Sequence, residues 1–153
     1  LNVMPDVRFV VAGSGDMLRS IVARVAHYRM GHRFTFTGFL KHDEVDRMYA
    51  SSDLYVMPSV SEPFGIAPLE AMVYDVPVLM SKQSGVSEVI HNALKVDFWD
   101  VRKMADRIFA VLAYPALGRF IAKNCAEELK HIRWENAAVK LEQIYADLVK
   151  RGN

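Results

Sequence analysis

Two glutamates, Glu62 and Glu70, stand eight positions apart on either side of a short segment that contains glycine and proline. An ionised carboxylate only accepts hydrogen bonds, and a vicinal pair of sugar hydroxyls offers it two donors. Between the two glutamates, the peptide N–H groups of Phe64, Gly65 and Ile66 precede an expected helix start, where such donors lack an intrahelical partner. The pattern suggests an anion site between two diol acceptors, which suits a ligand with a sugar, a diphosphate and a ribose in a row.

The flanking sequence predicts a strand, a loop and a helix around these residues. Residues 53–58 form a short β-branched and aromatic run that ends at a proline, which indicates a buried strand. Pro68 suits a first helical turn and places the helix start near Ala67, so Glu70 lies in the first turn and Glu62 in the loop. A purely structural alternative stays open at this point. Glu70 is favoured in a first turn by the helix dipole or a capping box, and Glu62 could be a solvated loop charge.

The run Glu62-Pro-Phe-Gly-Ile-Ala-Pro-Leu-Glu70-Ala-Met, preceded by Pro58-Ser59, resembles the E-x7-E motif of retaining glycosyltransferases of the GT-B fold, group 1 (family 4). The resemblance implies that Glu62 is the catalytic-site carboxylate and holds hydroxyls of the donor sugar. It implies that Glu70 binds the ribose diol of the nucleotide, and that residues 64–66 face the diphosphate. It implies neither a cofactor nor a metal beyond the nucleoside diphosphate sugar itself.

Three further positions match the same family. Gly13, in a glycine turn after the strand predicted at residues 7–12, would line the nucleotide side of the cleft, although it could serve only the turn. Leu40 would contact the nucleobase through its backbone, and a core side chain is an equal alternative. Gly85 follows Ser84 in a segment similar to the family's G-G-x-x-E turn and would let the backbone approach the donor sugar. The alternative for Gly85 is a plain helix-start turn.

The whole chain, residues 1–153, is interpreted as one α/β domain with a doubly wound parallel sheet, Rossmann-like, of the GT-B C-terminal type. Further strands are expected at residues 33–38 and 76–80, and helices at 41–50, 101–113, 116–130 and 134–150. In the family, one strand and a cationic R-x4-K-G stretch come before the position of Leu1. A start at Leu1 rather than Met therefore suggests a piece of a longer chain whose first strand is missing. We expect the strands starting at Val7 and Asp53 to close up, or one of their edges to pair with another molecule, as in a homodimer.

Composition narrows the class of protein. The apolar fraction of 52% is ordinary for a globular protein, and a formal net charge of +1 gives no reason to expect nucleic acid or an anionic membrane as a partner. The single cysteine, Cys125, excludes an internal disulfide and fits a reducing compartment, so a cytoplasmic location is expected. No apolar run reaches the length of a membrane span. The histidines show no spacing typical of zinc ligands, and P-loop and serine-hydrolase motifs are absent.

The resemblance implies that the intact parent is a hexosyltransferase that moves a sugar from a nucleoside diphosphate sugar to an acceptor. The acceptor domain would be N-terminal and missing here, and any peripheral membrane contact would come through it. The fragment alone would bind the donor weakly and transfer nothing. Two alternatives stay open: a GT-B sugar epimerase, expected to carry extra acid/base groups, and an inactive nucleotide-sugar binding or assembly module. The loss of family glycines at Ser84 and Ala93 favours the second alternative.

Overall fold

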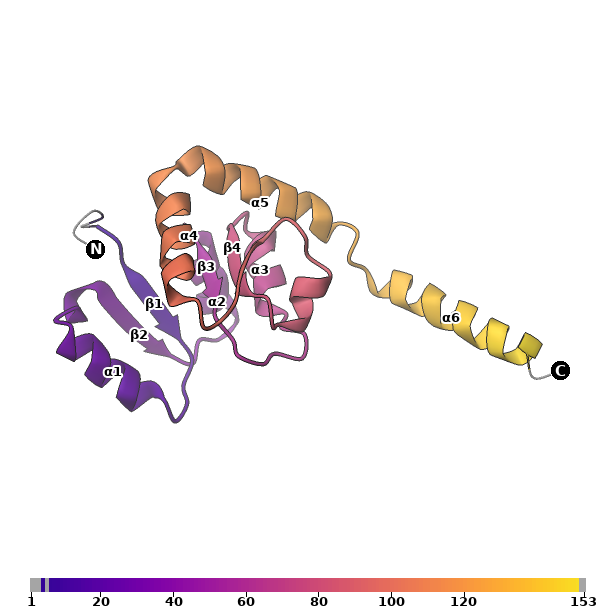
Figure 1. The fold of residues 1–153 in the computed structure, drawn as a ribbon, viewed down its shortest axis with the longest axis horizontal. Coiled ribbons are helices and arrows are strands. Elements are labelled where there is room, and N and C mark those ends of the chain that lie inside the picture. The colour runs from indigo at the N-terminus through magenta and orange to yellow at the C-terminus, as the bar shows by residue number, and fades with distance from the viewer. Residues whose placement is uncertain (1–3, 5, 152–153) are drawn as a thin grey trace. The chain divides into compact units, whose positions relative to one another are not determined.

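The computed structural model describes residue 4 and residues 6–151 (Figure 1). The chain divides into two compact units, residues 1–47 and residues 48–153, and each is described by itself. Every strand pair in the described residues is parallel. Parallel neighbours need a crossover between them, and helices or helical turns supply it here. The α/β class with parallel sheets is therefore confirmed.

The first unit is a two-stranded sheet whose strands are joined through a helix. Its elements are β1 (Phe9–Ala12), α1 (Leu18–His27), the 3-10 helix η1 (Gly31–Arg33) and β2 (Phe34–Gly38). The helix α2 (His42–Ala50) leads from this unit into the second. Phe9 pairs with Phe34 across the sheet, and their rings stack with centroids 4.6 Å apart. The β1–β2 pairing is irregular between Val11 and Ala12.

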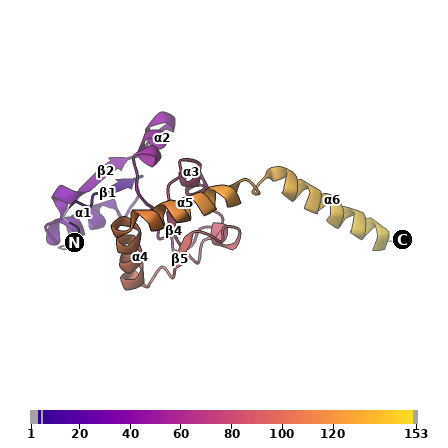
Figure 2. The same cartoon turned by 90° about the horizontal axis from the view of Figure 1, so that it is seen from above.

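The second unit contains a three-stranded sheet in the order β3-β4-β5 and the remaining helices. In chain order its elements are β3 (Tyr55–Met57), α3 (Ala67–Val73), β4 (Val78–Ser81), the 3-10 helix η2 (Gly85–Glu88), β5 (Leu94–Val96), α4 (Val101–Ala113), α5 (Pro115–Leu129) and α6 (Trp134–Arg151). Helix α3 contacts β3, β4 and α5, and α4 contacts β4, β5 and α5 (Figures 1 and 2).

The core of the second unit forms around the central strand. All four residues of β4 are buried, as expected for a strand that is covered on both faces. Met72 on α3 and Cys125 on α5 are almost fully buried with it. Helices α4 and α5 approach closely at Gly118, where an added Cβ would lie 3.4 Å from a methyl group of Val111. This packing fixes the carboxyl ends of β3 and β4. The motif segment follows β3, and the Gly85 turn follows β4.

The sequence placed most elements correctly and missed others. The helix at 101–113 is confirmed to the residue, while α5 begins one residue earlier than expected because Pro115 occupies its first turn. Strand β5 was not predicted, since its run Leu94-Lys95-Val96 is short and is interrupted by a lysine. In the described residues β1 pairs with β2 within the first unit, and β3 pairs with β4 within the second. The expected closing up of the strands that start at Val7 and Asp53 would join the two units and stays a prediction. Pairing of one edge with another molecule stays a prediction.

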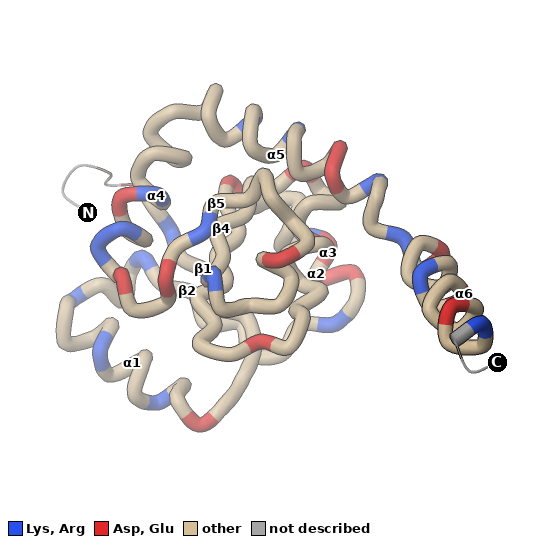
Figure 3. Tube along the Cα trace, turned by 45° about the vertical axis from the view of Figure 1, so that its right-hand side comes forward, with Lys and Arg blue, Asp and Glu red and all other residues tan. Residues whose placement is uncertain are grey.

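The last helix, α6, carries exposed apolar side chains. Leu141, Ile144, Tyr145 and Leu148 recur at helical spacing and are each more than half exposed. Basic and acidic residues are interspersed along the same helix (Figure 3). None of the described helices is both long and apolar enough to span a bilayer.

Candidate functional site

The motif loop, residues 58–66 between β3 and α3, leaves the backbone N–H groups of its last three residues without an acceptor in the described residues. Strand β3 ends at Met57, and α3 begins at Ala67 with Pro68 in its first turn, as predicted. Between them, the N–H groups of Phe64, Gly65 and Ile66 donate to no group in the described part of the chain. The side chains of Phe64 and Ile66 are 40% and 64% exposed, so the loop is not covered by other residues of the unit. These amides can therefore meet an external acceptor.

Gly65 is needed for both its conformation and its lack of a side chain. Its φ of 83° lies in the left-handed region that favours glycine. An added Cβ would lie 2.8 Å from Cγ of Glu62, so the Glu62 side chain packs directly on the glycine. The loop backbone thereby helps to set the position of the first carboxylate.

The charges of both motif carboxylates, Glu62 and Glu70, affect the hydroxyl of Tyr55. Glu62 is half-buried and Glu70 is exposed. Burial raises the pKa of the Tyr55 hydroxyl on β3, and the charges of Glu70 and then Glu62 raise it further. Glu62 packs on Gly65 in the loop that follows β3. Glu70 is held by Tyr49, whose ring packs against Tyr55 on β3. The structure thus brings Glu62, Glu70 and residues 64–66 into one region.

Glu70 has a hydrogen-bond partner that the sequence did not indicate. The Tyr49 hydroxyl donates to its Oε2 atom across 3.3 Å. Tyr49 is only 4% exposed, and its ring packs edge-on against Tyr55 with centroids 5.7 Å apart. Burial, the neighbouring Tyr55 and Glu70 all raise the pKa of Tyr49, so this phenol stays protonated and remains a donor. A tyrosine at an apolar helix position, which needs a partner for its hydroxyl, was the available signal.

Gly85 is the contact between the motif loop and the turn after β4. Its N–H donates to the Glu62 carbonyl at 2.9 Å, and the N–H of Val86 donates to the Phe64 carbonyl at 2.8 Å. An added Cβ at Gly85 would lie 2.0 Å from the Pro63 carbonyl oxygen, too close for any side chain. The glycine is thus required by backbone packing inside the protein. Its expected contact with a donor sugar stays a prediction, and its N–H is already occupied.

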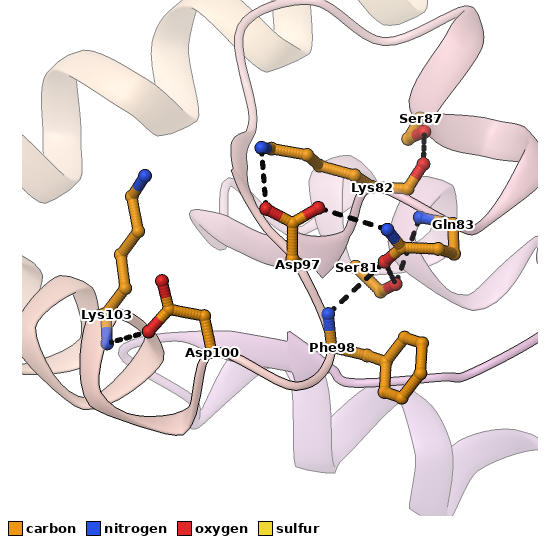
Figure 4. A network of polar contacts seen from close by, with 8 residues as sticks. All are labelled: Ser81, Lys82, Gln83, Ser87, Asp97, Phe98, Asp100 and Lys103. Atoms are coloured by element: carbon orange, nitrogen blue, oxygen red, sulfur yellow. Dashed lines mark hydrogen bonds and ion pairs between the residues drawn. The ribbon is translucent and has the colours of Figure 1, made fainter.

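A polar network holds the Gly85 turn to the end of the sheet (Figure 4). Gln83 donates to Asp97 Oδ1 at 3.1 Å and accepts from the N–H of Phe98 at 3.2 Å. Lys82 forms an ion pair with Asp97 Oδ2 at 2.9 Å. Hydrogen bonds from Lys82 and Gln83 lower the pKa of Asp97. Ser84, which stands where the family has a glycine, is 2% exposed and donates to the Ser81 carbonyl at 2.8 Å, so its hydroxyl is satisfied internally.

A second contact missed by the sequence secures the loop between η2 and β5. Oε1 of Glu128 accepts from the N–H of His91 at 2.7 Å, and Oε2 accepts from the N–H and the side-chain amide of Asn92 at 3.0 and 2.9 Å. Burial alone would raise the pKa of Glu128, but the hydrogen bonds from Asn92 and His91 lower it. This loop lacks the family's glycines, and a carboxylate 36 positions away holds it instead. Such a distance in sequence leaves no local signal.

The remaining candidates, Gly13 and Leu40, belong to the first unit. Gly13 has a φ of 110°, and its N–H donates to the Gly38 carbonyl at 2.7 Å at the carboxyl end of β1 and β2. Leu40 is half-buried just beyond β2. Both residues lie where a parallel α/β sheet commonly binds ligands. Their expected contacts with a nucleotide stay predictions.

None of the candidate site residues lines the surface hollow of the second unit or belongs to a possible metal site in the described residues. A surface hollow of about 550 Å³ is lined by α5 and the end of α3, including Asp75, Arg119, Lys123 and Lys130. The described histidines, cysteine and acidic residues form no group of three that could hold a metal ion.

The comparisons with known proteins decide the family. The model of "Glycosyl transferases group 1" matches residues 2–127. The chain belongs to this family. The group 1 domain is 32% identical over 145 residues to an uncharacterized glycosyltransferase of Methanocaldococcus jannaschii, covering 92% of this chain and 37% of the relative.

Solved structures agree with this assignment of the group 1 domain. It resembles sucrose-phosphate synthase from Thermosynechococcus elongatus with a TM-score of 0.79 and 29% identity, covering 97% of this chain and 40% of that one. Anabaena HepE, solved in complex with UDP-glucose, shares the fold with a TM-score of 0.77 at 21% identity, covering 96% of this chain and 42% of that one. The group 1 domain thus spans about two fifths of the length of these proteins.

Proposed function

We propose that this domain binds the donor of a retaining, family 4 type glycosyltransferase, which moves a hexosyl group from a nucleoside diphosphate sugar to an acceptor. The observation that carries the proposal is that Glu62 and Glu70 flank the free amides of residues 64–66 in a chain of the group 1 family. Anabaena HepE, which shares the fold, has been solved with UDP-glucose, and this supports a nucleotide sugar as ligand.

The roles follow the order of groups along such a ligand. Glu62 would accept hydrogen bonds from the sugar hydroxyls, and Glu70 from the ribose diol. The free amides of residues 64–66 would face the diphosphate between them. They would stabilise the negative charge that the departing diphosphate gathers, which is where fixed donors accelerate transfer. No side chain of this segment is required as a nucleophile.

Three further residues would contribute to the donor site of the intact protein. Gly13 and Leu40 would contribute to the nucleotide side, and Gly85 would support the motif loop beneath the donor sugar. Transfer would need an acceptor half supplied by additional chain, so residues 1–153 alone would bind donor without transferring it. The exposed apolar face of α6 would pack against that half.

We expect metal-independent binding, and the unpaired, buried Cys125 is consistent with a cytoplasmic protein.

Isothermal titration with UDP, GDP, ADP and their glucose conjugates tests the proposal on the intact natural protein that carries this sequence. With the best-binding nucleotide, Glu70→Ala should weaken binding of the free nucleotide and of its sugar conjugate by about tenfold or more, because two charge-assisted hydrogen bonds are lost. Glu62→Gln should weaken the conjugate but leave the free nucleotide unchanged, since only the conjugate carries the sugar. Glu142→Ala on α6 removes one exposed carboxylate elsewhere and serves as the matched control.

The outcomes separate the alternatives. Unchanged nucleotide binding by Glu70→Ala removes the ribose role, and no binding of any nucleotide removes the donor site altogether. Binding without transfer to any acceptor in the intact protein would instead indicate a binding module. Retention of the anomeric configuration is checked by NMR of the anomeric proton of the product. A product with inverted configuration contradicts the retaining assignment.

A further inference from the structure

Glu70 is an exposed side chain that has one fixed contact. It lies in the first turn of α3 without a cation near enough to form an ion pair in the described residues. A glutamate in this setting loses substantial rotamer freedom when a ligand immobilises it. A partner that restricts the carboxylate before the ligand arrives reduces that cost and strengthens binding.

Tyr49 has the properties of such a partner. Its ring is held between two aromatic neighbours, edge-on to Tyr55 and stacked on Tyr74 with centroids 6.0 Å apart. With 4% exposure it has no room to turn away, so its hydroxyl presents a fixed donor at the boundary between core and solvent. The distance of 3.3 Å to Glu70 Oε2 is longer than the usual O–H···O distance. Contacts of this kind often shorten when a ligand orders the site.

The carboxylate retains enough acceptor capacity for a ligand. An ionised carboxylate has about four acceptor positions on two oxygens, and the Tyr49 hydroxyl uses one of them. Oε1 accepts no hydrogen bond from the described residues and remains available with the rest of Oε2. Two hydroxyl donors can therefore bind while the tyrosine contact is kept.

We propose that Tyr49 is a positioning residue, whose hydroxyl holds the carboxylate of Glu70 in the orientation that receives the two ribose hydroxyls. The inference depends on the proposed role of Glu70 and adds a residue that the motif does not contain. Tyr49 comes from α2, whereas the motif occupies the loop before α3 and the helix itself, so the ribose site is built from two separate elements.

A double-mutant cycle tests the proposal by isothermal titration of the intact natural protein with UDP, GDP or ADP, whichever binds best. Tyr49→Phe keeps the packed ring and removes only the hydroxyl. It should weaken nucleotide binding about three- to tenfold, as expected for one net hydrogen bond. In a Glu70→Ala background the same change should have no further effect, because the hydroxyl acts through Glu70. Tyr114→Phe, at the junction of α4 and α5, is the control, since this tyrosine is 62% exposed and lies outside the candidate site, and it should change binding less than twofold.

The outcomes distinguish a positioning role of Tyr49 from a packing role and from a failure of the proposed role of Glu70. A Tyr49→Phe effect that persists in the Glu70→Ala background shows a packing role and overturns the proposal. An equally large effect in Tyr114→Phe shows that the loss is not specific to the Glu70 contact and overturns it as well. Unchanged binding in Tyr49→Phe overturns it too, provided that Glu70→Ala weakens binding. Unchanged binding in Glu70→Ala is the separate failure of the proposed ribose role itself.

Discussion

Replacing Gly85 by alanine should disrupt the joint between the motif loop and the turn after β4. The added Cβ would lie 2.0 Å from the Pro63 carbonyl oxygen and 2.9 Å from its carbon, and these are backbone atoms that no rotamer change can move. To relieve the overlap, the loop must separate and lose the hydrogen bonds of 2.9 and 2.8 Å that Gly85 and Val86 donate to it. Overpacking costs about 1–3 kcal/mol, and each lost hydrogen bond costs about 1 kcal/mol. With both hydrogen bonds lost, we expect the free energy of unfolding to fall by about 3–5 kcal/mol.

Urea unfolding followed by tryptophan fluorescence measures this loss. Trp99 belongs to the second unit, where its ring packs edge-on against Phe98 with centroids 4.8 Å apart, so its signal reports the unit that contains Gly85. Glu88→Ala is the control, because Glu88 is an exposed residue at the end of the same 3-10 helix, η2, in the second unit. Where Gly85→Ala still folds, nucleotide binding should be reduced, since residues 62–66 shift with the loop. A Gly85→Ala variant within about 0.5 kcal/mol of the wild type would refute the reasoning from close approach.

Three further predictions concern other sites of the second unit. Asp75 has a φ of 56° just after α3, a position suited to glycine, so Asp75→Gly should be more stable than Asp75→Ala by about 1 kcal/mol in urea unfolding, and the reverse order would contradict this. Burial, and then the charge of Glu128, raise the pKa of Cys125 to about 11. The folded chain therefore keeps a proton that the unfolded chain loses near pH 8.5, and stability should fall as the pH rises from about 9 to 11, less so in Cys125→Ala. The pKa of Glu128 is lowered, so its contribution to stability is present above the unfolded value of about 4.3 and is lost as the pH falls through the folded pKa. Glu128→Gln should lose about 1–2 kcal/mol at neutral pH and show a weaker acid dependence, whereas the exposed control Glu142→Gln should match the wild type in urea titrations from pH 3 to 7.

Much of the fold followed from local signals. Apolar spacing defined α4 to the residue, and Pro68 marked the start of α3, because both signals act over one or two helical turns. Strand β5 was missed because Lys95 interrupts its apolar run, so the strand is specified by its pairing with β4 rather than by its own sequence. The arrangement of the described strands in two sheets also depends on pairing partners, which no periodicity contains.

The sequence by itself determined the family, the parallel α/β class and the motif with Glu62 and Glu70, because residue types at fixed spacing carry that information. Only the tertiary structure decided what holds these groups. It showed that Tyr49 contacts Glu70 and that Gly85 is confined by the Pro63 carbonyl. Both contacts join segments about 20 positions apart in the chain, and packing of the core brings them together. Distances between such segments are set by the whole fold, so no local pattern of residues can specify them.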